Sequence, residues 1–367
     1  MITLHAPRQL PPVPEHGGPD GRPPPRHDFS TNANPLPAPE AVWQALRQAD
    51  RSRYPDPAYG ALRAELAASR GLSPERVLVS AGNGEAIRRL TLAAALHGRR
   101  NVWLPEPGYG EYRAAAAALG LGLRPYADAQ ELLDGLRLDP ALSLVWANEP
   151  HNPSGRSWPA ELWQLLGAQC AGAGHWLALD RAYEDLRLQG HDPVPPTVAA
   201  LAWQLWTPNK ALGLPGVRAG WIEAPAEAAP RLHAAVLGLA PSWVLSAEGV
   251  ALLRASRTAE VREWLVGAQE TLRADTARQR LLLSGLGWQQ QDSCTPFWLA
   301  RPNGAPAALP GRLARLREAG VQLRDARSFG LPGWVRLSTQ STTAQDALVA
   351  AWSGRAGHTA PMPEDAA

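Results

Sequence analysis

Lysine is nearly absent from this chain of 367 residues, and arginine carries almost all of the positive charge. Cysteine is also scarce. Cys170 and Cys294 lie far apart, outside any metal-ligand spacing, so we expect no metal site and two free thiols in a reducing cytoplasm. No apolar run approaches the roughly 20 residues of a membrane helix, and the first residues, "MITLHAPRQLPPVPEHGG", lack the apolar segment of a signal peptide. A net charge of +2 gives no electrostatic reason to expect nucleic acid.

The hydrophobic share of 45% is enough for a large core and two lobes. Residues 1–27 are rich in Pro and Gly and predict an extended arm. In residues 28–235 short apolar runs alternate with helical stretches, which predicts an α/β domain with a mostly parallel, doubly wound sheet. Residues 236–352 hold a long helical stretch followed by short strands and helices, as in a smaller α+β domain, and we expect a flexible tail at 353–367.

The elements expected from periodicity fall into two sets. The strand candidates of the first domain are 76–82, 101–108, 142–150, 175–183, 200–208 and 217–224. The helix candidates of the second domain are 258–287, a segment near 310–319 and a last helix that ends near Trp352.

Ligands bind at the carboxyl ends of the strands in open α/β sheets, so the residues that follow each strand matter most. "AGNGEA" puts Asn83 and Gly84 at a helix start, where backbone amides attract an anion. Ile87 occupies the third glycine position of a dinucleotide fingerprint, and an ordinary turn is the alternative. In "EPGYGEY", Tyr109 stands between two glycines that leave room for a flat ring beside it, or it is a core tyrosine.

Two further strand ends carry polar side chains. "NEPHNPSG" fixes Asn152 in a proline-bounded turn, although Asn-Pro turns are common. In "LALDRAY", Asp180 follows an apolar strand and Tyr183 comes three positions later. An acid in this place pairs with a cationic ring nitrogen or simply caps the next turn.

"TPNKALGLPGVRAGW" contains a solitary lysine, Lys210, with Thr207 before it and Arg218 eight positions after it. One interpretation is a surface lysine in a turn. The other is an enclosed amine nucleophile beside an arginine that binds an anion.

The order of these motifs resembles the pyridoxal-phosphate enzymes of aminotransferase fold type I, over almost the whole chain. The resemblance implies that Lys210 forms the covalent link to pyridoxal phosphate and that Asp180 keeps the ring nitrogen protonated. It implies that Asn152 and Tyr183 bind the phenolic oxygen and that Tyr109 stacks on the ring. The phosphate would be held by four residues: Asn83, Gly84, Thr207 and Arg218.

The same resemblance implies a homodimer, because related enzymes bind the phosphate with a tyrosine from the partner subunit. Here that residue is Tyr54 in "YPDPAYGALR". Two positions depart from the family pattern. Asn209 replaces the usual Ser or Thr before the lysine, and Arg181 replaces the usual acid after the aspartate.

The substrate side resembles the threonine-phosphate decarboxylases of cobalamin biosynthesis, on "HGG" at 16–18 and "DFSTNANPL" at 28–36. This resemblance implies decarboxylation of O-phospho-L-threonine, with a substrate site made of His16, Gly17, Asn32, Asn152, Arg324 and Arg336. The spacer between the two segments is short for that family, and a solvated His16 is the alternative.

Histidinol-phosphate aminotransferases share most of the pattern, including "NANP", and are the alternative family. A non-catalytic domain of a transcriptional regulator is disfavoured because the 27-residue arm has no room for a DNA-binding module. Decarboxylation and transamination are not separated by residue types, since the bond that breaks depends on the angle at which the substrate is held.

Overall fold

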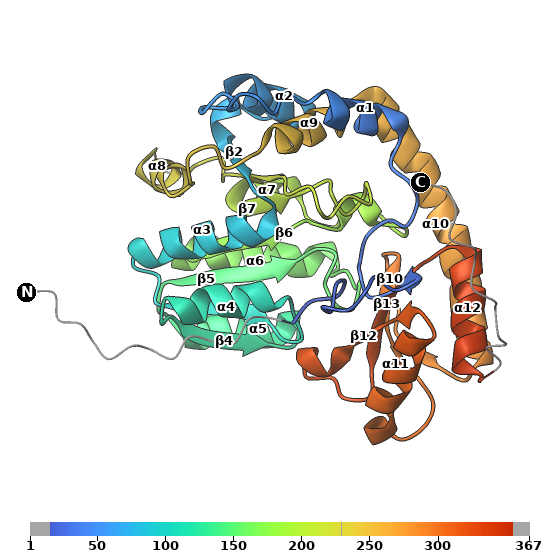
Figure 1. The fold of residues 1–367 in the computed structure, drawn as a ribbon. Helices are drawn as coiled ribbons and strands as arrows, with labels where there is room; N and C mark the ends of the chain where they lie inside the picture. The colour runs from blue at the N-terminus through green and yellow to red at the C-terminus, as the bar shows by residue number, and fades with distance from the viewer. Residues whose placement is uncertain (1–14, 229, 355–367) are drawn as a thin grey trace, which may run out of the picture.

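The computed structural model describes residues 15–228 and 230–354. The predictions made for residues 1–14 of the arm and 355–367 of the tail lie outside the described residues. The chain forms a large lobe around one sheet and a C-terminal lobe beside it (Figure 1). The strands of the large sheet are β2 (Val77–Ser80), β3 (Asn101–Pro105), β4 (Gly122–Tyr126), β5 (Ser143–Asn148), β6 (Trp176–Asp180), β7 (Trp203–Trp206) and β8 (Gly220–Glu223).

These strands lie in the order β2-β8-β7-β6-β5-β3-β4. Neighbours are parallel from β7 to β4, whereas β8 runs antiparallel to both β7 and β2. The predicted doubly wound, mostly parallel sheet is therefore confirmed. The sequence analysis missed β4, which contains Pro125; proline lacks the N–H that a central strand needs, but it is tolerated on this edge strand.

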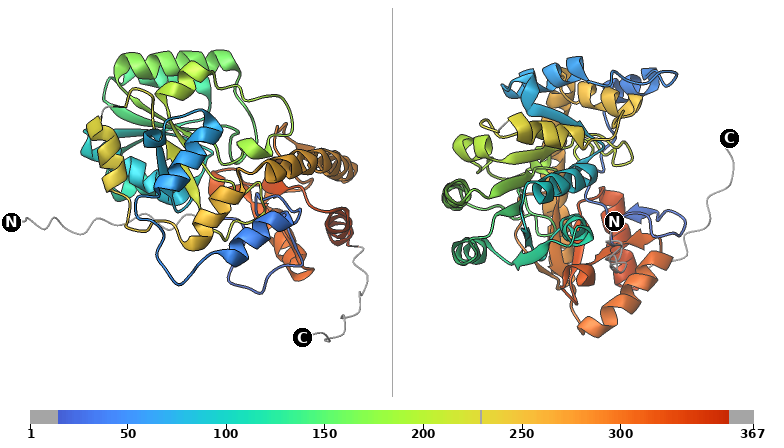
Figure 2. Two further views of the ribbon diagram at one scale, coloured as in Figure 1. Left: turned by 90° about the horizontal axis from the view of Figure 1, so that it is seen from above. Right: turned by 90° about the vertical axis from the view of Figure 1, so that its left-hand side faces the viewer.

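Helices cover both faces of this sheet (Figure 2). Leu144 and Trp146 of β5 point to the face covered by α3 (Asn83–Leu96), α4 (Gly110–Ala118) and α8 (Pro230–Gly238). Val145 and Ala147 point to the opposite face, covered by α5 (Ala129–Leu138), α6 (Ala160–Ala173) and α7 (Pro196–Leu201). All four side chains are buried, so the strand is apolar throughout, as parallel strands buried on both faces are.

Another group of helices packs at the β2 edge. It comprises α1 (Glu40–Gln48), α2 (Gly60–Arg70), α9 (Ala247–Ala255) and the start of α10 (Ala259–Gly285). α10 has 27 residues and runs from this group to the C-terminal lobe (Figure 1), which confirms the helix predicted over 258–287.

The C-terminal lobe contains a four-stranded antiparallel sheet in the order β12-β13-β10-β9. Its strands are β9 (Gln289–Gln290), β10 (Phe297–Arg301), β12 (Arg324–Asp325) and β13 (Val335–Ser338), and its other helices are α11 (Leu309–Glu318) and α12 (Thr342–Trp352). The described residues also form four short 3-10 helices: η1 (Pro74–Arg76), η2 (Glu184–Leu186), η3 (Pro306–Ala308) and η4 (Ala326–Phe329).

The segment before residue 31 packs on the C-terminal lobe. β1 (His27–Asp28) pairs in parallel with β11 (Val321–Gln322), and Phe29 is buried in the core of that lobe. A few residues later the chain crosses to the large lobe, where the backbone N–H of Asn34 donates to the carbonyl of Lys210 at 2.9 Å. The domain division at residue 235 stays a prediction. None of the helices within 15–228 and 230–354 is long and apolar enough to span a bilayer.

Candidate active site

The predicted cofactor residues gather at the carboxyl ends of the parallel strands. Asp180 is the last residue of β6, Lys210 follows β7, and Asn152 lies in the turn after β5. Together they line one cavity, and every residue that the sequence assigned to the cofactor within one chain also lines it: Asn83, Gly84, Tyr109, Asn152, Asp180, Tyr183, Thr207, Lys210 and Arg218.

Lys210 occupies an environment that favours its neutral amine. Burial, together with the nearby guanidinium groups of Arg336 and Arg218, lowers the pKa of Lys210 to about 8, while Asp180 acts in the opposite direction. No carboxylate among the described residues forms an ion pair with it. Lys210 is also the only lysine of the chain. A desolvated amine of this kind is a nucleophile near neutral pH.

The carboxylate of Asp180 is fully engaged by hydrogen bonds. Its Oδ1 accepts from Asn83 Nδ2 at 2.6 Å and from the backbone N–H of Ala182 at 3.1 Å, and its Oδ2 accepts from Tyr112 Oη at 2.8 Å. Burial raises the pKa of Asp180, and these three donors and Lys210 oppose that rise. The result is a buried, hydrogen-bonded carboxyl group in the wall of the cavity, where a cationic ring nitrogen would pair with its ionised form.

Tyr112 is a residue that the sequence analysis missed. It is completely buried in α4, and its hydroxyl also accepts from Asn148 Nδ2 at 2.6 Å. Asn148 itself lines the cofactor cavity. The sequence did contain a hint of it, because Tyr112 follows Tyr109 by three residues in "GYGEY", at the start of the helix that Tyr109 caps.

Another part of this cavity, at the start of α3, has the features of a phosphate site. α3 begins at Asn83, so its first backbone amides are free to bind an anion. Gly82 has a φ of 82°, and a Cβ there would lie 2.8 Å from Nη2 of Arg218, so glycine allows the arginine to approach the helix start. Thr207 donates to the carbonyl of Ala219 at 2.7 Å.

Several buried polar atoms in the cofactor cavity have no hydrogen-bond partner among the described residues. They include the side-chain oxygens of Asn83, Asn148 and Asn209. Buried polar atoms are nearly always satisfied in a working protein, so these atoms indicate a polar ligand. Pyridoxal phosphate fits this arrangement of the Asp180 carboxyl group, the Lys210 amine and the anion site at the start of α3.

A second cavity adjoins the first and shares four of its residues: Tyr109, Asn152, Tyr183 and Lys210. Its other walls include all the remaining residues that the sequence assigned to the substrate: His16, Gly17, Asn32, Arg324 and Arg336. They come from the N-terminal segment and from β12 and β13 of the C-terminal lobe, whereas the shared residues belong to the large lobe, so this cavity lies between the two lobes.

Arg336 is buried in the second cavity without a carboxylate partner among the described residues. Its Nη1 donates to Asn152 Oδ1 at 2.8 Å and its Nη2 donates to the carbonyl of Ser30 at 2.7 Å, while Nε has no partner. Burial, with Arg324 nearby, lowers the pKa of Arg336 to about 10. A buried cation without a counter-ion calls for an anionic ligand.

The N-terminal segment forms one wall of the second cavity. A Cβ on Gly17 would lie 2.1 Å from the Ser30 carbonyl oxygen and 3.1 Å from Arg336 Nη2, so only glycine fits against this arginine. Both amide atoms of Asn32 are buried without a partner among the described residues. The His16 ring lies 5.6 Å from that of Tyr109, and its Nε2 is 3.5 Å from Glu111 Oε1.

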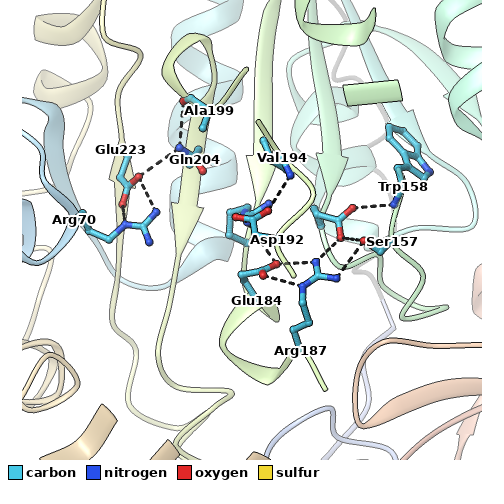
Figure 3. A network of polar contacts seen from close by, with 12 residues as sticks. Arg70, Ser157, Trp158, Glu184, Arg187, Asp192, Val194, Ala199, Gln204 and Glu223 are labelled. Atoms are coloured by element: carbon cyan, nitrogen blue, oxygen red, sulfur yellow. Dashed lines mark hydrogen bonds and ion pairs between the residues drawn. The ribbon is translucent and has the colours of Figure 1, made fainter. Parts of the chain in front are cut away.

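A buried ionic network around Arg187 supports the turn that carries Asn152, and Figure 3 shows the contacts of Arg187 with Glu184 and Ser157. Arg187 donates to Glu149 at 2.6 Å and to both oxygens of Glu184 at 2.8 and 2.9 Å, and Glu149 also accepts from Ser157 and from the Trp158 N–H. Arg181, which replaces the acid usual in the family, belongs to this network, because its guanidinium pairs with Asp192 and Glu184. The unusual cation is therefore compensated by two acids outside the cofactor cavity.

Tyr54 lies elsewhere. Its side chain is 75% exposed and stacks on Trp243, with ring centroids 4.3 Å apart, and it lines neither cavity. Within one chain it therefore contributes nothing to the site.

Comparisons with known proteins identify the family of this chain and several relatives. The family model described as "Aminotransferase class I and II" matches residues 26–351. A histidinol-phosphate aminotransferase of Halorubrum lacusprofundi is 31% identical over 323 residues, or 85% of this chain and 84% of the relative. A threonine-phosphate decarboxylase of Salmonella typhimurium is 32% identical over 210 residues, or 53% of this chain and 55% of the relative. The solved histidinol-phosphate aminotransferase of Sinorhizobium meliloti, in complex with pyridoxal-5'-phosphate, superposes with a TM-score of 0.77 at 24% identity and covers 90% of this chain and 91% of that chain.

Proposed function

Because the chain belongs to the pyridoxal-phosphate-dependent family of class I and II aminotransferases, we propose that it decarboxylates a small phosphorylated amino acid, O-phospho-L-threonine. The family membership and the superposition confirm the predicted fold type I and the predicted cofactor. The product of the proposed reaction is aminopropanol phosphate, and the second product is carbon dioxide.

The residues that line the cofactor cavity support the following roles within that reaction. Bound pyridoxal phosphate supplies an electron sink for the pair of electrons left when a bond to the substrate Cα breaks. Asp180 would hold a proton on the ring nitrogen, Tyr109 would lie beside the ring, and Lys210 would provide the amine that carries the cofactor and returns a proton to Cα. Arg218, Thr207 and the start of α3 would bind the phosphate.

One observation carries the choice of substrate: the buried, uncompensated Arg336 lies against Gly17 and Asn152 beside Lys210. A carboxylate bound by Arg336 would be held next to the reacting carbon, and the angle of that carboxylate decides whether carbon dioxide leaves. Arg324, His16 and Asn32 then form a second polar group for the substrate phosphate.

Transamination of histidinol phosphate is the second candidate. The relatives that cover most of this chain favour it, since several are histidinol-phosphate aminotransferases. That substrate has no carboxylate, so Arg336 would serve only the second half-reaction, in which a 2-oxo acid accepts the amino group.

The oligomer and the location are part of the proposal. We expect a homodimer in which Tyr54 reaches the phosphate of the partner subunit, because Tyr54 is exposed and remote from its own site. Cys170 and Cys294 are free thiols, in keeping with a reducing cytoplasm.

The test is a product assay on the purified enzyme with added cofactor. We expect carbon dioxide and aminopropanol phosphate from O-phospho-L-threonine. The kcat/KM of this reaction should exceed the kcat/KM for glutamate formation from histidinol phosphate and 2-oxoglutarate. Efficient glutamate formation without any carbon dioxide release would select the aminotransferase.

A further inference from the structure

Arg324 is held in this structure by a carboxylate that the proposed function does not use. Its Nη1 lies 3.3 Å from Glu15 Oε1, and its Nη2 donates to the Glu15 carbonyl at 2.7 Å and to Ser328 Oγ at 2.6 Å. The Arg324 side chain is only 6% exposed, whereas that of Glu15 is 69% exposed. A buried guanidinium is thus neutralised by a carboxylate that is mostly in water.

This ion pair lies between two cavities. The inner one is the substrate cavity with Lys210. The outer one opens beside α11 and is lined by Arg22, Arg317 and Arg327. Glu15 and Arg324 line both cavities, together with His16, Gly17 and Ser30. The pair therefore forms part of the wall that separates solvent from the substrate cavity.

From this geometry we infer that Glu15 is an anion-operated gate and a specificity determinant: its carboxylate occupies the anion position on Arg324 until the phosphate of the substrate displaces it. The inference rests on the proposed function for its substrate but not for its test. A phosphate group carries more charge than one carboxylate and has three acceptor oxygens, so it competes well for a buried arginine.

The asymmetry of exposure makes the exchange feasible. Releasing Glu15 costs little when phosphate takes its place, because the exposed carboxylate returns to water and the buried Arg324 is not left without an anion. Arg324 stays in place, since it is buried and its Nη2 is held by Ser328. A singly charged or neutral ligand binds Arg324 less strongly, so it displaces Glu15 less often. The exchange therefore favours dianionic substrates.

The Asp20–Arg317 pair offers a matched control. Arg317 donates to both oxygens of Asp20 at 2.9 and 3.0 Å, and this pair lines the outer cavity but not the inner one. Removing either acid deletes one negative charge from the same region, and only Glu15 touches the anion position on Arg324.

The experiment is calorimetric titration of the cofactor-loaded enzyme with inorganic phosphate at constant ionic strength. Glu15→Gln should lower the Kd of phosphate about two- to fivefold, and Asp20→Asn should leave it unchanged. In an Arg324→Gln background, Glu15→Gln should have no further effect, because the two residues act on one anion position. Thermal melts verify that each variant is folded.

An unchanged or higher Kd in Glu15→Gln overturns the inference, as does an equal gain in Asp20→Asn. The titration needs no turnover. If phosphate binds more tightly to Glu15→Gln while O-phospho-L-threonine is not decarboxylated, the gate stands and the proposed reaction fails.

Discussion

Tyr112 Oη donates a 2.8 Å hydrogen bond to Oδ2 of Asp180, and both groups are buried. The tyrosine hydroxyl is itself fixed by Asn148. Asp180 must remain ionised to hold a proton on the cofactor ring, yet burial raises its pKa. Tyr112 is thus a positioning residue that keeps the carboxylate both oriented and charged.

Tyr112→Phe removes this donor without changing the shape of the core. The pKa of Asp180 should rise further, so the acid limb of the kcat profile should move to higher pH by about one pH unit, and the loss of kcat should grow as the pH is lowered. Asp180→Asn should bind cofactor and lose most activity at every pH. Tyr126→Phe is the control, because its buried hydroxyl bonds only to the Trp146 carbonyl. A pH profile of Tyr112→Phe that matches the wild type would show that the hydrogen bond is merely structural.

The single lysine makes cofactor attachment simple to assay. Borohydride reduction of the loaded enzyme should fix one cofactor per chain, on the peptide that contains Lys210. Lys210→Ala should yield no reducible adduct in intact-protein mass spectrometry while its circular dichroism is preserved. An adduct of equal yield in Lys210→Ala would exclude Lys210 as the cofactor lysine.

Lys210 should cost stability in the cofactor-free protein. Its pKa falls from the usual 10.5 to about 8, so between these values the unfolded chain binds a proton that the folded chain does not. Stability should therefore rise with pH from 8 to 10.5, and the penalty should be complete below pH 8. Lys210→Met should be more stable by about 1–3 kcal/mol at pH 7, with the gain shrinking toward pH 10.5. Urea unfolding at several pH values measures this, and a gain that does not depend on pH would point to packing instead.

Arg336→Ala separates the two candidate reactions. Loss of a hydrogen bond to a charged group costs about 1.5–3 kcal/mol, so kcat/KM for O-phospho-L-threonine should fall roughly ten- to a hundredfold. Histidinol phosphate has no carboxylate, so its first half-reaction should change little. Arg327→Ala is the control, since that arginine is exposed and pairs with Asp325 at the surface. Equal losses with both substrates would contradict the role of Arg336 as a carboxylate clamp.

The sequence predicted the parts of the site that follow strand ends, because strand order and loop position are local properties. Lys210, Asp180 and Asn152, which line the cofactor cavity, were located in this way, and the long helix α10 was predicted from its periodicity. Tyr112 was missed because its role depends on a distance to Asp180, across 68 residues of sequence. Glu15 was missed for the same reason, since only folding brings it to Arg324. The antiparallel direction of β8 was not expected either, because an apolar strand has no sequence signal for its direction.

Because β1 pairs with β11, two stretches that are distant in the sequence contribute to the same part of the site. Most residues proposed to bind the substrate lie at 15–32 and 324–336, two stretches that are far apart in the sequence but line the same cavity. The residues proposed to hold the cofactor lie in between, on the large lobe. Exchange of substrate preference between relatives by recombination would therefore require both ends of the coding sequence to change together, whereas the chemistry could be inherited as one continuous central block.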